Sequence, residues 1–272
     1  MEGWKDGDVL VNGVRLRYHR SGGDLPPVVL VHGLTDHGWY WAALARALAP
    51  AYDVVLYDAR GHGESDPSPQ GYTLDILAGD LVALVAALGL ERPAVIGHSM
   101  GGSTASVAAA EHPGLFRCLV LEDPVWPDPS RAWDPASLIA SWRANLLENQ
   151  ATPREALIAK QREAAPGWAD EDYELWADSK AAVRPEALEV LASFARPWVE
   201  DARRIDCPIL VLTGEPARGA IVDEAAEAAL LAARPDARVV RMSGTGHQVR
   251  RERFAAYRDE VLRFLAQPHT ER

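Results

Sequence analysis

The sequence runs Gly97-His98-Ser99-Met100-Gly101-Gly102 between an apolar segment (93–96) and an alanine-rich segment (103–111), and this stretch decides the fold. It predicts a strand, a sharp turn with Ser99 at its tip, and a helix, which is the context of a nucleophilic serine. A serine hydroxyl is a poor nucleophile, so it must stand clear of the sheet where a base can reach it. Gly97 and Gly101 leave room for strained backbone at Ser99, and the free N–H groups that open the helix favour an oxyanion beside it.

Three further motifs follow predicted strands. The apolar run 28–31 ends in His32-Gly33-Leu34, and the run 54–57 ends in Asp58-Ala59-Arg60-Gly61-His62-Gly63-Glu64-Ser65. Near the C-terminus, residues 239–242 lead into Gly244-Thr245-Gly246-His247. Each motif is moderately specific by itself, and their order along one chain is a much stronger signal.

The ordered set of motifs resembles the α/β-hydrolase superfamily over nearly the whole chain. It is most similar to the capped branch that includes epoxide hydrolases, C–C bond hydrolases, lactonases and cofactor-free haloperoxidases. The resemblance implies an α/β fold, with a mostly parallel sheet flanked by helices and an inserted helical cap.

The spacing of apolar runs divides the chain in the same way. Asn12-Gly13 between two alternating segments predicts an N-terminal hairpin, after which apolar strands alternate with helices as in a mostly parallel sheet. The alternation of strands and helices stops between residues 125 and 199, and roughly 75 residues without a strand are too many for a loop. We therefore expect a core of residues 1–124 and 200–272 and a helical cap or lid of residues 125–199.

Composition narrows the classes of partner. The net charge of −11 argues against a nucleic-acid partner and against an anionic membrane surface. The two cysteines, Cys118 and Cys207, are expected to be buried free thiols. The sequence shows no signal-peptide pattern and no membrane-spanning run, so the expectation is a soluble cytoplasmic protein. Homodimer formation is left open.

The catalytic groups are expected to meet at the carboxyl ends of the parallel strands. His247, in a glycine-containing loop, would take the proton of Ser99 as general base and return it to the leaving group. By the resemblance, the oxyanion hole would consist of the backbone N–H groups of Met100, directly after the nucleophile, and Leu34.

The acid that orients His247 is less clear from sequence. The superfamily often carries it in a G-x-x-D pattern after the penultimate strand, but here Ala217 stands at the aspartate position. Some relatives place the acid one strand earlier, and Asp123 lies there, 24 residues after Ser99. A carboxylate at this point would fix the tautomer of His247. The alternatives are Glu215, Glu122 and Asp223.

Aromatic residues are concentrated in the cap, which holds six of the nine tryptophans. Trp126, immediately after the predicted acid, is expected to line the substrate pocket together with Trp39 and Tyr40. An apolar, aromatic pocket suits a small hydrophobic ester or lactone.

The sequence thus predicts a serine esterase or lactonase that forms an acyl-enzyme on Ser99. A serine at the elbow argues against epoxide hydrolysis and haloalkane dehalogenation, which require a carboxylate there. C–C bond hydrolysis or cofactor-free perhydrolysis on the same triad are alternatives, and a ligand sensor with slow or vestigial hydrolase activity is an alternative of another class. The histidine and cysteine spacings predict no metal site, and no dinucleotide-binding loop or other cofactor motif is present.

Overall fold

The computed structural model describes residues 3–127 and 133–267, which build one eight-stranded sheet with the strand order β1-β2-β4-β3-β5-β6-β7-β8. The first two strands are antiparallel to their neighbours, and the others are parallel. The strands are β1 (Lys5–Val11), β2 (Val14–Arg20), β3 (Pro27–Val31), β4 (Asp53–Tyr57), β5 (Ala94–His98), β6 (Cys118–Glu122), β7 (Ile209–Thr213) and β8 (Arg238–Arg241). The predicted fold class is confirmed.

Residue type explains why the sheet has an antiparallel N-terminal hairpin and a parallel remainder. The N-terminal hairpin turns at Asn12 and Gly13, which both have positive φ, as the tight turns that suit the twist of paired strands require. The inner parallel strands are runs of Val, Leu and Ile that are buried on both faces. Alternate side chains of β3 enter different cores, since Val29 and Val31 pack on one side and Val28 and Leu30 on the other.

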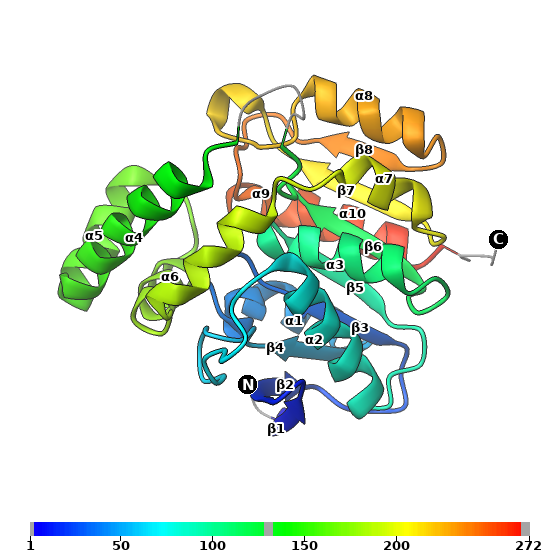
Figure 1. Cartoon of the computed structure of the whole chain (residues 1–272), viewed down its shortest axis with the longest axis horizontal. Coiled ribbons are helices and arrows are strands. Elements are labelled where there is room, and N and C mark those ends of the chain that lie inside the picture. Colours follow the sequence, from blue (N-terminus) through cyan, green and yellow to red (C-terminus); the bar gives the residue numbers. More distant parts are fainter. Residues whose placement is uncertain (1–2, 128–132, 268–272) are drawn as a thin grey trace.

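Helices cover both faces of the sheet (Figure 1). One face carries α2 (Leu74–Ala87), α3 (Met100–Glu111), α7 (Trp198–Arg204) and α8 (Glu224–Ala233). The other carries α1 (Ala42–Leu48), preceded by the turn η1 (Gly38–Trp41), and α10 (Phe254–Leu265), preceded by α9 (Val249–Glu252). A three-residue turn, η3 (Pro216–Arg218), follows β7.

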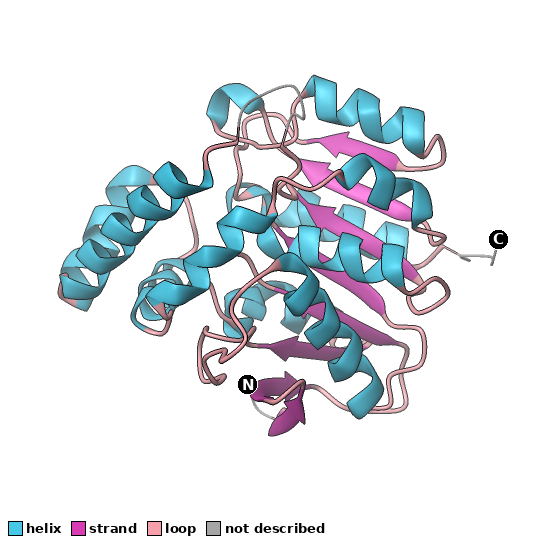
Figure 2. Cartoon of the chain, in the orientation of Figure 1, coloured by secondary structure: helices cyan, strands magenta, loops and turns pink. Residues whose placement is uncertain are grey.

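A helical insertion, at the position of the predicted cap and called the cap below, lies between β6 and α7. It contains α4 (Pro135–Ala151), α5 (Arg154–Ala164), α6 (Asp170–Ala181) and η2 (Pro185–Ser193), and within its described residues it has no strand (Figure 2). Helix α4 and helix α5 project from the side of the molecule at which the parallel strands end (Figure 1). Helix α7 begins at Trp198 and packs on α3, so the last residues of the predicted cap are part of the core's helical layer.

No helix in the described ranges is both long and apolar enough to cross a membrane.

Candidate active site

Ser99 occupies a strained turn between β5 and α3. Its backbone has φ 52° and ψ −116°, and its N–H donates to the carbonyl of Glu122 at 2.9 Å. A Cβ at Gly97 would lie 2.4 Å from the Gly101 oxygen, and one at Gly101 would lie 2.2 Å from the Val31 oxygen. Only glycine allows these close approaches, so the turn that carries Ser99 depends on both glycines.

Asp123 and His247 are joined by a short hydrogen bond, with Nδ1 of His247 2.5 Å from Oδ2 of Asp123. The Asp123 side chain is fully buried and also accepts from the Thr213 hydroxyl at 2.7 Å and from the N–H groups of Ile221 and Val222 at 2.8 and 3.0 Å. Burial raises the pKa of this carboxyl, but the hydrogen bonds from His247, Ile221 and Thr213 outweigh it and hold the pKa below its ordinary value. Asp123 is therefore a carboxylate oriented toward His247.

The other acids considered from sequence are engaged elsewhere. Glu215 accepts from the Ser243 hydroxyl and the Gly244 N–H, and so braces the loop that leads to His247. Glu122 is buried in an ion pair with Arg250, with 2.6 Å between Oε2 and Nη1. Asp223 caps the N-terminus of α8. The geometry selects Asp123 as the partner of the histidine.

Leu34 and Met100, which carry the two expected oxyanion donors, border the same cavity as Ser99. Met100 is the first residue of α3, so its N–H has no intrahelical acceptor. Leu34 lies in the turn after β3, and its N–H has no acceptor among the described residues. His32 holds this turn, because its Nδ1 donates to the Gly33 carbonyl at 2.8 Å while its Nε2 accepts from the Ala59 N–H at 2.9 Å.

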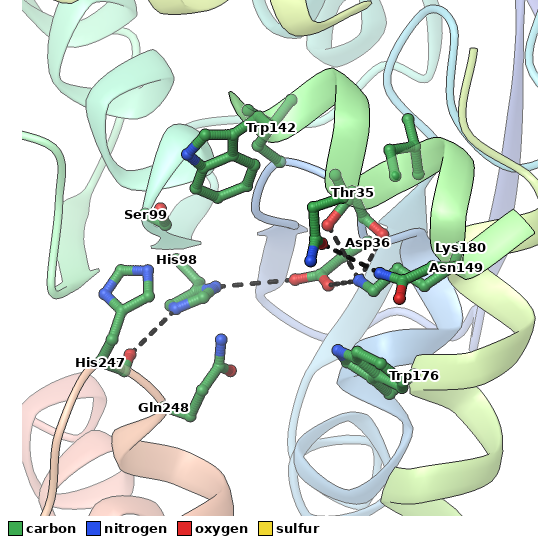
Figure 3. Close-up of a pocket in the computed structure, with 13 residues that line it drawn as sticks. Thr35, Asp36, His98, Ser99, Trp142, Asn149, Trp176, Lys180, His247 and Gln248 are labelled. Atoms are coloured by element: carbon green, nitrogen blue, oxygen red, sulfur yellow. Dashed lines mark hydrogen bonds and ion pairs between the residues drawn. The ribbon is translucent and has the colours of Figure 1, made fainter. Parts of the chain in front are cut away.

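Two cavities meet at the Ser99 and His247 side chains. One has a volume of about 380 Å³ and is largely apolar, with walls that include Val125, Trp133, Leu138, Trp142, Leu191 and Phe194. The other, called the polar cavity below, has a volume of about 210 Å³ and walls that are about half polar, with the polar residues Asp36, His98, Asn145, Asn149, Lys180 and Gln248 among them (Figure 3). Leu34 and Trp142 border both.

The expected pocket residues Trp126, Trp39 and Tyr40 line neither cavity, and this prediction was wrong. Trp126 is 2% exposed and stacks on Trp198 with 4.7 Å between ring centroids, while its chain neighbours Val125 and Pro127 face the apolar cavity. In an extended segment alternate side chains point to opposite sides, so Val125 and Pro127 face the cavity while Trp126 faces away from it.

Trp39 and Tyr40 lie in η1, and Trp39 packs at the side of the sheet covered by α10. Trp39 packs on His19 with ring centroids 4.4 Å apart. Tyr40 is buried beneath Arg251, whose guanidinium carbon is 3.1 Å from the centre of the tyrosine ring. Cap tryptophans further along the chain, Trp133, Trp142 and Trp176, take the wall positions instead.

Three polar residues of the site were missed from sequence. His98 directly precedes Ser99, and its ring lies 4.7 Å from that of His247 and borders the polar cavity. Asp36 and Lys180 come from the turn after β3 and from the cap, and no motif marks either of them. In the described residues, no group of three or more His, Cys, Asp or Glu side chains is arranged to hold a metal ion.

Comparison with known proteins places this arrangement in a family. Residues 26–249 match the model of the alpha/beta hydrolase fold. The chain is 31% identical over 258 residues to N-formylmaleamate deformylase of Pseudomonas putida, covering 89% of this chain and 90% of the relative.

Two solved structures align over nearly their whole length. The N-formylmaleamic acid deformylase from Pseudomonas putida superposes with a TM-score of 0.80 at 26% identity, covering 94% of this chain and all of the other. The enol-lactonase from Burkholderia xenovorans superposes with a TM-score of 0.75 at 27% identity, covering 96% of this chain and all of the other. With its eight-stranded sheet, elbow and late histidine, this chain belongs to the alpha/beta hydrolase family.

Proposed function

We propose that the protein is a serine hydrolase that cleaves a carboxylic ester or lactone through an acyl-enzyme on Ser99. The observation that carries the proposal is the hydrogen bond between Asp123 and His247 beside a strained serine. In the first step, Nε2 of His247 takes the hydroxyl proton as Ser99 attacks the substrate carbonyl. Asp123 keeps the proton of the imidazole on Nδ1 and stabilises the imidazolium that forms.

The oxyanion that develops on the substrate carbonyl would accept from the N–H groups of Leu34 and Met100. Collapse of this intermediate releases the alcohol, to which His247 returns the proton. A water then attacks the acyl-enzyme with His247 again as base, releasing the carboxylic acid and the Ser99 hydroxyl.

The two cavities suggest the shape of the substrate. The apolar cavity suits a hydrocarbon or aromatic arm. The polar cavity would take a second arm that forms hydrogen bonds, because it presents the side-chain amides of Asn145, Asn149 and Gln248. The enol-lactonase with a similar fold supports an ester or lactone bond between the arms.

A second candidate is hydrolysis of an N-acyl amide on the same residues. The observation that favours it is the 31% identity to N-formylmaleamate deformylase across nine-tenths of both chains. The chemistry needs one change, since the leaving nitrogen is expelled only after His247 has protonated it.

The experiment is a panel of matched p-nitrophenyl esters, lactones and N-formyl amides, assayed with the wild-type protein and Ser99→Ala, together with labelling by a fluorophosphonate. We expect repeated turnover of an ester or lactone and labelling at Ser99, and we expect Ser99→Ala to lose both by several orders of magnitude. Faster turnover of the amides would select the second candidate. Turnover that persists in Ser99→Ala would exclude the acyl-enzyme, and a single turnover would indicate a sensor.

A further inference from the structure

Lys180 is a cap lysine whose ammonium group binds the turn that follows β3. It lies in the last turn of α6 and is 5% exposed. Its Nζ donates to both the carbonyl oxygen and the hydroxyl of Thr35, each at 2.9 Å, and lies 3.6 Å from Oδ1 of Asp36. Burial lowers the pKa of Lys180 to about 8, although Asp36 opposes the shift. A buried ammonium destabilises a fold unless its partners are well placed, so these contacts indicate a specific role.

The turn that Lys180 binds is strained and carries an oxyanion donor. The Asp36 N–H donates to the Gly33 carbonyl at 3.1 Å, which closes a four-residue turn with Leu34 and Thr35 in the middle. Thr35 has a φ of 67° at the third position, which normally belongs to glycine. The conformation of this turn sets the direction of the Leu34 N–H. An external contact that holds the carbonyl and the hydroxyl of Thr35 therefore restrains the turn and, with it, the direction of the Leu34 N–H.

The same contacts extend toward the histidine (Figure 3). Oδ2 of Asp36 lies 3.7 Å from Nδ1 of His98, and Nε2 of His98 donates to the backbone carbonyl of His247 at 3.1 Å. A Cβ at Gly33 would lie 2.7 Å from Nδ1 of His98, so glycine is required for this approach. Lys180 thus contacts the turn that carries the Leu34 N–H and is linked, through Asp36 and His98, to the loop that carries His247.

We propose that Lys180 is a positioning residue that holds the oxyanion turn, so that the cap helix α6 completes the catalytic site. The inference rests on the proposed function and adds to it a role for the cap in the chemical step. Other contacts dock α6 independently, since Glu171 pairs with Arg46 and Asp172 pairs with Arg251 near the start of the helix. Removing the ammonium group therefore leaves the helix attached.

A direct role in binding a substrate carboxylate fits the geometry less well. The two strong hydrogen bonds of the ammonium group go to Thr35, and its charge faces the buried carboxylate of Asp36. A substrate carboxylate in the polar cavity would face the Asp36 carboxylate as well, and the two like charges would repel each other.

The test compares Lys180→Met, Lys180→Arg and the docking control Arg46→Met in the full chain. The readouts are the rate of fluorophosphonate labelling and the kcat and KM for p-nitrophenyl butyrate. We expect Lys180→Met to lower kcat and the labelling rate by about 10- to 100-fold with KM within about threefold, because a misplaced oxyanion donor weakens transition-state binding only. Lys180→Arg should recover most of the loss, and Arg46→Met should match the wild type.

Repeating the Lys180→Met substitution in a Thr35→Gly variant distinguishes a positioning role of Lys180 from a role in docking the cap. Glycine adopts a positive φ without strain, so in Thr35→Gly the turn needs less external support, and we expect Lys180→Met to cost only about threefold there. An equal loss in both backgrounds would show that Lys180 only docks the cap. The inference would also be overturned if Lys180→Met were labelled at the wild-type rate. It would likewise be overturned if Lys180→Met changed only the KM of esters that carry a carboxylate.

Two further controls keep the test decisive. Should Lys180→Met fail to fold, Thr35→Ala removes one of the two hydrogen bonds, and its kcat should fall by about 3- to 10-fold. An unchanged kcat in that variant would overturn the inference. Wild-type protein that does not label at all would overturn the proposed function itself, whereas labelling that is indifferent to Lys180 overturns the positioning role alone.

Discussion

Nδ1 of His247 lies 2.5 Å from Oδ2 of Asp123, although the two residues are 124 positions apart in the chain. Asp123 follows β6 and His247 follows β8, and the strand between them is β7. The Asp123 N–H donates to the Leu212 carbonyl of β7 at 2.9 Å, and the carboxylate then accepts from the Thr213 hydroxyl. The sheet itself therefore sets the position of the acid under the histidine.

From this relationship we predict that Asp123→Asn lowers kcat by roughly 10³- to 10⁴-fold, because the amide no longer selects the tautomer with a proton on Nδ1. Steady-state kinetics on the best ester of the panel measures the effect. The matched control is Glu215→Gln, which keeps its contacts with the His247 loop and should change kcat by less than about tenfold. The opposite ranking of the two variants would identify Glu215 as the acid.

Two tryptophans should give contrasting effects. Trp142 borders both cavities and is 41% exposed, so Trp142→Ala should alter the ranking of substrates by about 10- to 200-fold in relative kcat/KM. Trp126 is buried against Trp198, so Trp126→Ala should lower the free energy of unfolding by about 3–5 kcal/mol with the ranking preserved. Denaturant unfolding and the substrate panel together measure both. A common factor for all substrates in Trp142→Ala would contradict its place in the pocket.

The buried ion pair of Arg60 and Asp80 lines neither cavity and should matter for stability and not for chemistry. Arg60 binds Asp80 through Nε and Nη2, each at 2.6 Å, and both residues are essentially buried. Asp80→Asn should destabilise the fold by about 3 kcal/mol, because it leaves a buried guanidinium without its charge partner.

The control for that variant is Asp178→Asn, which breaks an exposed pair with Arg154 and should cost less than about 1 kcal/mol. Chemical denaturation of both variants measures the difference. A large fall in kcat for folded Asp80→Asn would show that the pair supports the reaction.

The sequence was informative wherever a local rule controls the structure. The strands are apolar runs, the elbow needs glycine at positions 97 and 101, and the carboxyl ends of neighbouring parallel strands converge. These rules predicted the sheet and the meeting of Asp123 with His247. Closeness in sequence would suggest an ion pair between Asp58 and Arg60, but Asp58 accepts from the N–H groups of Gly38 and Glu64 while Arg60 binds Asp80.

Side chains whose direction depends on packing between distant segments could not be predicted. Trp126 follows the acid in sequence, but the stacking surface offered by Trp198 turns it away from the cavity. Lys180 looks like any lysine on an exposed helix face until α6 is docked against the turn at Thr35. Neither partner can be identified from spacing, because each contact joins segments that are far apart in the sequence.

The last prediction concerns the alkaline side of the pH profile. Lys180 faces Asp36 and Arg251, with the imidazoles of His32, His37 and His62 nearby, and its pKa is lowered to about 8 by burial. The ammonium form that binds Thr35 most strongly is therefore lost as the pH rises through about 8. We expect kcat/KM to fall there, after correction for spontaneous hydrolysis.

In Lys180→Arg, which stays charged, we expect this limb to move to higher pH. Titration of Lys180 does not itself favour unfolding in this range. The unfolded lysine keeps its proton up to about 10.5, so between these pH values the unfolded state binds more protons and this group makes the fold more stable as pH rises. Activity and stability should therefore change in opposite directions between pH 8 and 10, as measured by initial rates and by urea unfolding. If kcat/KM of Lys180→Arg fell at the same pH as that of the wild type, the alkaline limb would belong to another titratable group.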